Sequence, residues 1–188
     1  MKHNKRHPRL ICVTGLKNSG KTTVCTALIA ELIARGLAVA ALKSSHVSRL
    51  TLDSRSGDSF ALAESGASFV LVQGPGESLI HEKGGRSFAE MVERVPEDAD
   101  YIISEGGDPG AAEAVIVCLK DRSEWEDTLR TRGVPRSRIL AVSGSFAGGR
   151  GAPGNRTFEG FPVVDAARDE DRRALAERIL SNADPRRS

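Results

Sequence analysis

One segment near the start of the chain has residue types and spacing suited to binding phosphate. Residues 15–22 read GLKNSGKT and fit the pattern G-x-x-x-x-G-K-[ST] at every fixed position. Glycines in such a loop let the backbone turn tightly, so that successive N–H groups point at phosphate oxygens. The pattern predicts a nucleoside triphosphate site, with contacts expected from Gly15, Lys17, Asn18, Ser19, Gly20, Lys21, Thr22 and Thr23.

Two side chains at the end of this loop have specific expected roles. Lys21 can bridge the β- and γ-phosphates, and we expect it to be a catalytic residue. The Thr22 hydroxyl can be a ligand of Mg²⁺, which usually binds few protein groups together with phosphate oxygens. The plain alternative is a strand, a turn and a helix with an accidental lysine. The apolar run before the loop and the amphipathic pattern after it favour the phosphate site.

A site of this kind usually has a carboxylate near the end of a neighbouring strand, where it holds Mg²⁺ or orders the attacking water. Glu105 directly follows the apolar run 101–104, so we expect it to be both a metal ligand and a catalytic residue. The alternative for Glu105 is a solvated glutamate in a loop. Asp58 is the second candidate metal ligand, although aspartate is also favoured at a helix N-terminus simply as a cap.

Lys43 follows the second predicted strand, also at the expected binding edge of the sheet. It could contact a phosphate or an acidic ligand, and it is therefore a further candidate for nucleotide binding. His46 lies in the polar stretch that follows, where a lone histidine is more often solvated than functional.

The elements that must position these residues alternate between strands and helices, with short links. This alternation predicts an α/β fold of the P-loop NTPase type, in which helices cover both faces of a mostly parallel sheet. Apolar runs rich in Ile, Leu and Val predict buried strands, and apolar residues at helical spacing predict helices. The strands are expected at 9–14, 37–42, 68–72, 78–81, 101–104, 114–119, 138–142 and 161–164, and the helices at 21–35, 58–65, 88–95, 124–130 and 169–180.

We expect one nucleotide-binding domain over residues 1–188. A Gly-Pro-Gly turn between two of the predicted strands indicates a β-hairpin extension near residues 68–82. Flexible segments are expected in the basic N-terminus 1–8, in the stretch 144–160, which is rich in Gly, Pro and Arg, and in the tail 181–188.

Bulk composition limits the class of protein. Hydrophobic residues make up 39% and charged residues 28% of the chain, as in an ordinary folded domain. No segment is apolar for long enough to span a membrane. The basic residues at the two ends are interpreted as solvated tails, with a phosphate-rich or acidic partner as the alternative, so no nucleic acid partner is expected. Cys12, Cys25 and Cys118 are predicted to be reduced core residues of a cytoplasmic protein.

Several further matches follow the phosphate loop in a fixed order. They are Thr23 after the loop, Arg35-Gly36, Val39–Lys43, Asp53, Gly57-Asp58-Ser59, Gly66-Ala67 and Ile103–Gly106. Together they resemble the MobB family of adapter proteins in molybdopterin-guanine dinucleotide biosynthesis. The loop alone is generic, whereas the ordered set is fairly specific.

The resemblance implies a homodimer that binds GTP with Mg²⁺ and hydrolyses it weakly. Such a protein assists a partner, the molybdenum-cofactor guanylyltransferase, which attaches GMP to molybdopterin. The resemblance also implies metal-side roles for Asp58 and Glu105. The chain departs from the family's Lys-His-x-His at Ser44 and from its Glu-Gly-Phe-Lys at Gly107-Asp108, positions that bear on pterin or partner contacts and not on the phosphate loop.

The choice of base stays open at the level of sequence. The chain has no Asn-Lys-x-Asp run, the usual guanine reader of GTPases, and 141–144 lies where a late loop could contact the base. A small-molecule kinase or ATP-dependent ligase on the same fold is an alternative, although an arginine-rich lid of the nucleoside-kinase kind is lacking. A third hypothesis is a non-enzymatic interaction module that keeps the loop only for structure.

Overall fold

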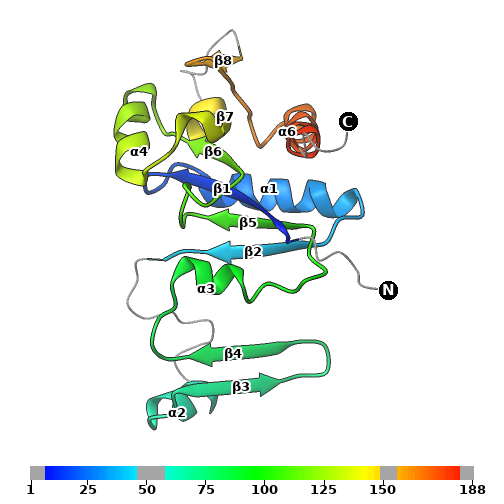
Figure 1. The fold of residues 1–188 in the computed structure, drawn as a ribbon, viewed down its shortest axis with the longest axis vertical. Coiled ribbons are helices and arrows are strands. Elements are labelled where there is room, and N and C mark those ends of the chain that lie inside the picture. Colours follow the sequence, from blue (N-terminus) through cyan, green and yellow to red (C-terminus); the bar gives the residue numbers. More distant parts are fainter. Residues whose placement is uncertain (1–6, 46–57, 149–155, 183–188) are drawn as a thin grey trace. The chain divides into compact units, whose positions relative to one another are not determined.

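Five short apolar segments form a parallel sheet in the computed structural model, which describes residues 7–45, 58–148 and 156–182 (Figure 1). Neighbouring strands run parallel throughout, so their carboxyl ends meet at one edge. The sheet order is β2-β5-β1-β6-β7, with β1 (Arg9–Gly15), β2 (Val39–Lys43), β5 (Tyr101–Glu105), β6 (Ala114–Cys118) and β7 (Ile139–Ser143). Every residue of β6 is buried, as expected for a central strand covered on both faces.

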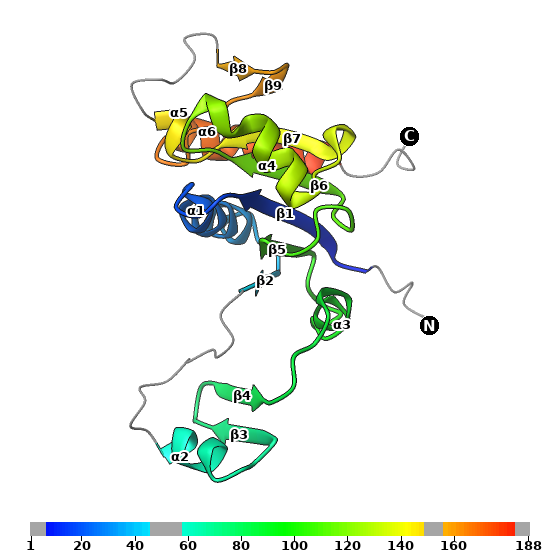
Figure 2. The same ribbon diagram turned by 90° about the vertical axis from the view of Figure 1, so that its left-hand side faces the viewer.

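Helices cover both faces of this sheet (Figure 2). α1 (Lys21–Ala34) and α6 (Asp169–Ser181) pack against each other and share one hydrophobic core with the sheet. The buried residues of α1 recur at helical spacing, so that one side of the helix faces the sheet: Val24, Leu28 and Leu32. On the other face, α4 (Trp125–Arg132) contacts β1 and buries Trp125 and Leu129. The predicted α/β fold, a mostly parallel sheet between layers of helices, is confirmed.

Shorter elements lie between and after these. They are α3 (Phe88–Val92), the 3-10 helices η1 (Arg122–Glu124) and η2 (Arg136–Arg138), α5 (Ser145–Gly148), β8 (Thr157–Phe158) and β9 (Phe161–Pro162). α3 ends earlier than the helix predicted at 88–95. The stretch 144–160, for which flexibility is predicted, contains α5 and β8, while 149–155 lies outside the described residues.

Aromatic contacts hold the β8–β9 hairpin. The ring centroid of Trp125 lies 5.5 Å from that of Phe158 and 5.9 Å from that of Phe161. Phe158 also meets Phe146 of α5, with ring centroids 5.2 Å apart. These edge-to-face and tilted pairs tie a hairpin that is too short to be stable alone to the helices beside it.

Within the described residues the chain divides into two compact units. The first comprises Met1–Ser44 and Met91–Ser188, and it contains the whole parallel sheet. The second, Ser45–Glu90, is inserted in the sequence between β2 and β5.

The second unit contains α2 (Asp58–Glu64) and an antiparallel hairpin of β3 (Phe69–Gln73) and β4 (Ser78–Glu82). At its turn the N–H of Gly74 donates to the carbonyl oxygen of Glu77 over 2.8 Å. The hairpin predicted near residues 68–82 is therefore confirmed. α2 packs against β3 and buries Ala63, and β3 buries Val70.

One side chain ties the first strand to the last helix. Arg9 begins β1, and its guanidinium donates to the carbonyl oxygens of Ile179 over 3.1 Å and Asn182 over 3.2 Å. The same group pairs with the carboxylate of Glu113 over 2.7 Å. Arg9 thereby satisfies carbonyls at the C-terminus of α6, which lack partners within the helix.

Candidate nucleotide-binding site

The candidate phosphate loop joins the end of β1 to the start of α1. Gly15 is the last residue of β1, and there is no room for a side chain at its position. A Cβ there would lie 2.2 Å from the carbonyl oxygen of Cys118 and 2.6 Å from Oγ of Ser19. The first glycine of the motif therefore lets the loop lie directly against the neighbouring strand β6.

The turn after β7 lies against the same loop. The N–H of Ser145 donates to the carbonyl oxygen of Ser19 over 3.2 Å. A Cβ on Gly144 would lie 2.2 Å from that oxygen and 2.7 Å from the carbonyl oxygen of Leu119. From the sequence, 141–144 is a candidate only for contacting the base, so this support of the loop was missed. The glycine directly after a predicted strand was the one available signal.

The polar side chains of the loop differ in their surroundings. Nζ of Lys21 donates to the carbonyl oxygen of Leu16 over 2.7 Å, so the side chain folds back along the loop. Oγ of Ser19 is buried and has no hydrogen-bond partner among the described residues. Buried polar atoms are rarely left unpaired without a reason, and an oxygen-rich ligand would supply one here. The side chains of Lys17 and Asn18 are exposed.

Three predicted residues meet at the edge of the sheet beside the loop. Oγ1 of Thr22 donates to Oε2 of Glu105 over 2.8 Å. Nζ of Lys43 lies 3.3 Å from the same carboxylate oxygen. The strand register explains why Lys43 lies beside Glu105, because Lys43 on β2 is the parallel partner of Glu105 on β5. On the other side of β5, the partner of Glu105 is Val13 of β1. A threonine hydroxyl and a carboxylate side by side fit the oxygen ligands that Mg²⁺ takes.

Two candidates cannot be placed at this edge. Asp58 is the first residue of α2, the start of a helix as predicted, but it belongs to the second unit, and its side chain lies outside what the structure describes. His46 also lies outside the described residues. The metal-side role of Asp58 stays a prediction.

Three free, buried thiols lie in the strands and helix that carry the site: Cys12 on β1, Cys118 on β6 and Cys25 on α1. Burial raises the pKa of Cys12 to about 11. Burial, with a smaller contribution from the negative charge of Glu105, raises the pKa of Cys25 to about 12. The pKa of Cys118 is raised as well, again by burial. The predicted placement of all three in the core is confirmed.

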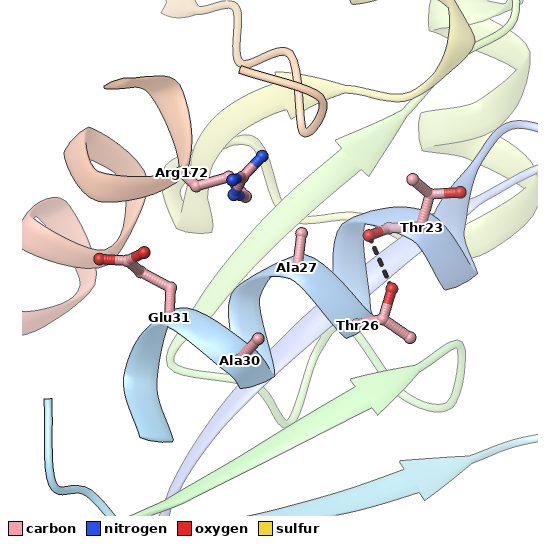
Figure 3. Close-up of a pocket in the computed structure, with 6 residues that line it drawn as sticks. All are labelled: Thr23, Thr26, Ala27, Ala30, Glu31 and Arg172. Carbon is pink, nitrogen blue, oxygen red and sulfur yellow. Dashed lines mark hydrogen bonds between the residues drawn. The ribbon is translucent and has the colours of Figure 1, made fainter. Parts of the chain in front are cut away.

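A hollow of about 430 Å³ lies between α1 and α6 (Figure 3). It begins at the residue after Thr22 and is lined by Thr23, Thr26, Ala27, Ala30, Glu31 and Arg172. Its polar groups bond within the chain, since Oγ1 of Thr26 donates to the carbonyl oxygen of Thr23 over 3.0 Å. The guanidinium of Arg172 likewise donates to the carbonyl oxygen of Ala166 over 2.9 Å. At Thr23 the hollow adjoins the predicted nucleotide contacts of the loop.

The part of the chain that the structure describes contains no group of three or more His, Cys, Asp and Glu side chains that could hold a metal ion by themselves. None of the described helices has both the length and the apolar character needed to cross a membrane.

Similarity to known proteins agrees with the geometry. The family model for MobB, molybdopterin guanine dinucleotide synthesis protein B, matches residues 10–137. A stretch of 63 residues is 41% identical to the molybdopterin-guanine dinucleotide biosynthesis adapter protein of Haemophilus influenzae. That stretch is 34% of this chain and 35% of the curated relative, so it spans about a third of the relative's length.

Solved structures of MobB proteins share the fold. The Bacillus subtilis MobB structure matches with a TM-score of 0.68 at 18% identity, over 94% of this chain and 99% of that one. A molybdopterin-guanine biosynthesis protein B structure matches with a TM-score of 0.62 at 26% identity, over 92% and 97%. The family model covers well over half of this chain, and the chain therefore belongs to the MobB family.

Proposed function

We propose that the chain binds GTP with Mg²⁺, hydrolyses it slowly at most, and acts as an adapter in molybdopterin-guanine dinucleotide biosynthesis. The observation that carries the proposal is the 2.8 Å hydrogen bond from Thr22 to Glu105 at the mouth of the loop. It sets a hydroxyl oxygen and a carboxylate oxygen side by side, next to the groups suited to phosphate. These are the hard oxygen ligands that Mg²⁺ prefers, and phosphate oxygens would complete the set.

In this proposal the backbone N–H groups of the loop and the ammonium of Lys21 bind the β- and γ-phosphates. Thr22 and Glu105 hold Mg²⁺, which would neutralise charge on the phosphates and orient them. Lys21 and Glu105 are the proposed catalytic groups of the slow hydrolysis. Lys21 would stabilise the charge that develops on the terminal phosphate, and Glu105 would help to order the attacking water.

The proposed partner is the transferase that attaches GMP to molybdopterin, because the relative from Haemophilus influenzae is named as an adapter of that biosynthesis. A cytoplasmic location is proposed with it. The preference for GTP over other nucleoside triphosphates rests on the same kinship.

A homodimer is also proposed, and the hairpin of the second unit supports it. Phe69 and Leu71 lie two positions apart on β3, and Ile80 of β4 pairs with Leu71. Their exposed fractions are 51%, 60% and 53%. Since alternate residues of a strand share a face, the three form one apolar face on an isolated two-stranded sheet, which favours burial against another protein. A second copy of the chain is the proposed occupant.

Calorimetric titration of GTP and of ATP, each in excess Mg²⁺ and in chelator, tests the proposal. We expect GTP to bind more tightly than ATP, and Mg²⁺ to be needed for full affinity. The Thr22→Val variant, which keeps the shape but loses the hydroxyl, should lose most of the Mg²⁺ dependence.

Equal affinity for the two nucleotides would count against the guanine assignment. Rapid nucleotide-dependent phosphorylation of a small acceptor, found in a panel of candidates, would replace the adapter proposal with a small-molecule kinase or ATP-dependent ligase.

A further inference from the structure

The metal-side carboxylate already has a cation beside it. Oε2 of Glu105 accepts a hydrogen bond from Thr22 over 2.8 Å and lies 3.3 Å from the ammonium of Lys43. The side chain of Glu105 is only 15% exposed, whereas that of Lys43 is 63% exposed. A nearly buried carboxylate is thus paired with a lysine that reaches it from the solvent side.

Thr22 and Lys43 differ in whether they allow a metal ion to bind Oε2 of Glu105. A threonine hydroxyl can keep donating its proton to Glu105 while its own lone pairs face a metal ion. An ammonium has donors only and is a compact positive charge, so it repels a divalent cation that approaches the same oxygen. Lys43 and Mg²⁺ therefore compete for Oε2 of Glu105, while Thr22 does not.

Moving the Lys43 ammonium away from Glu105 costs little free energy. The lysine stem is flexible, and most of the Lys43 side chain is in solvent, so the ammonium can leave the carboxylate and be rehydrated. Glu105 has less freedom, because it ends β5 between β1 and β2, and its own carbonyl oxygen accepts from the N–H of Ser44 over 3.0 Å. Metal entry should therefore displace the lysine and leave the carboxylate in place.

We propose that Lys43 is a positioning residue that occupies the metal side of Glu105 until Mg²⁺ arrives. Without metal, Lys43 neutralises the carboxylate and keeps it directed at Thr22. The ion must displace Lys43, so this lysine raises the Mg²⁺ concentration that nucleotide binding requires. The inference rests on the proposed binding of nucleotide with Mg²⁺ and adds a built-in competitor for the ion.

The test is the Mg²⁺ concentration that gives half-maximal GTP binding, measured by calorimetry on the full chain. Lys43→Met should lower this concentration by roughly two- to fivefold, the range expected for loss of an exposed ion pair. Lys43→Arg, which keeps the charge, should stay near the wild-type value. Lys120→Met is the matched control, because it removes an equal charge from a lysine that pairs with Glu124 over 2.9 Å. It should leave the Mg²⁺ requirement unchanged.

The same substitution made in a Glu105→Gln protein distinguishes competition for Glu105 from a general effect of the protein's charge on Mg²⁺ binding. In Glu105→Gln the carboxylate is absent, so adding Lys43→Met should produce no further shift. The inference would be overturned if Lys43→Met lowered the required Mg²⁺ concentration equally in the Glu105→Gln protein. It would also be overturned if Lys43→Met alone left that concentration unchanged or raised it. Circular dichroism melting of each variant checks that it is folded.

The proposed function and the competition for Glu105 fail through different results of this experiment. If the wild-type chain does not bind GTP even in excess Mg²⁺, the proposed function fails, and the competition falls with it. If the wild-type chain binds GTP and Lys43 does not affect the Mg²⁺ requirement, only the competition is wrong.

Discussion

Lys21 and Lys43 are both cations beside the candidate site, and their present partners differ. Lys21 donates to a neutral carbonyl in its own loop, that of Leu16. Lys43 pairs with the full charge of Glu105, 62 positions away in the sequence. The motif alone predicts a role for Lys21, because its spacing is local. No local pattern could predict the partner of Lys43, because the pairing depends on β2 and β5 being neighbours in the sheet.

Loss of the Lys21 ammonium should weaken nucleotide binding. Hydrogen bonds to charged groups are worth about 1.5–3 kcal/mol, so Lys21→Ala is expected to reduce affinity for GTP roughly ten- to hundredfold. Calorimetry with the purified variant measures this loss, and an unchanged melting temperature shows that the fold is intact. Unaltered affinity would support a module that keeps the loop only for structure.

Because the thiols of Cys12 and Cys25 are buried, we expect the protein to lose stability at alkaline pH. Below the ordinary thiol pKa of 9.0, Cys12 and Cys25 are protonated in both the folded and the unfolded chain. Between 9.0 and about 11 for Cys12, or about 12 for Cys25, only the unfolded chain releases the proton. The free energy of unfolding should therefore fall as pH rises, by about 1.4 kcal/mol per pH unit for each thiol.

Urea denaturation on either side of pH 9 measures this fall. The double variant Cys12→Ala, Cys25→Ala removes two of the titrating groups and should show a shallower dependence on pH. An equally steep fall in the double variant would assign the effect to other groups.

At the scale of elements, the sequence predicts the strand, loop and helix around residues 9–34 almost to the residue, because apolar period and motif agree there. It does not predict α5 or the firm packing of the β8–β9 hairpin. The position of these elements depends on contacts such as that between Trp125 and Phe158. These residues are 33 positions apart, so no local sequence pattern contains the contact. The flexibility predicted from the Gly and Pro content of 144–160 stays a prediction.

The turn between β7 and α5 should be sensitive to a single methyl group. Gly144→Ala would place a Cβ 2.2 Å from the carbonyl oxygen of Ser19, at a φ of 94° that side chains rarely adopt. Strain of this kind costs about 1–3 kcal/mol, so we expect a lower melting temperature. GTP affinity should also fall, because the turn supports the phosphate loop.

Gly85→Ala is the control for this change. Its Cβ would meet no atom within 4 Å, so its stability should stay within about 0.5 kcal/mol of the wild type. A Gly144→Ala protein as stable as Gly85→Ala would contradict the close approach of the turn to the loop.

At the scale of the molecule, the chain has one unit with a candidate site and one with an exposed apolar hairpin. Apolar period and turn signals predict the hairpin itself. They do not predict which of its residues are left uncovered, because that depends on what α2 hides. β3 buries Val70 and leaves Leu71 60% exposed.

The proposed dimer makes Leu71 a test position. Leu71→Glu should shift the chain towards monomer in light scattering after size exclusion, because it places a charge in the apolar face. The fold should survive, since Leu71 is mostly exposed within one chain. Glu77→Lys, a charge change in the exposed turn of the same hairpin, should leave the assembly unchanged. A wild-type chain that is monomeric throughout the accessible range of concentration would rule out the second copy as occupant.

The position of the inserted unit has an evolutionary consequence. All five strands of the parallel sheet, the phosphate loop, Lys43 and Glu105 belong to the first unit. Selection can therefore lengthen, shorten or exchange Ser45–Glu90 without rebuilding the loop, the Thr22–Glu105 pair or the core beneath them. Asp58 is the exception, because this predicted metal ligand lies in the insertion. Apart from it, we expect the insertion to accept changes of length and sequence more readily than the unit that carries the loop.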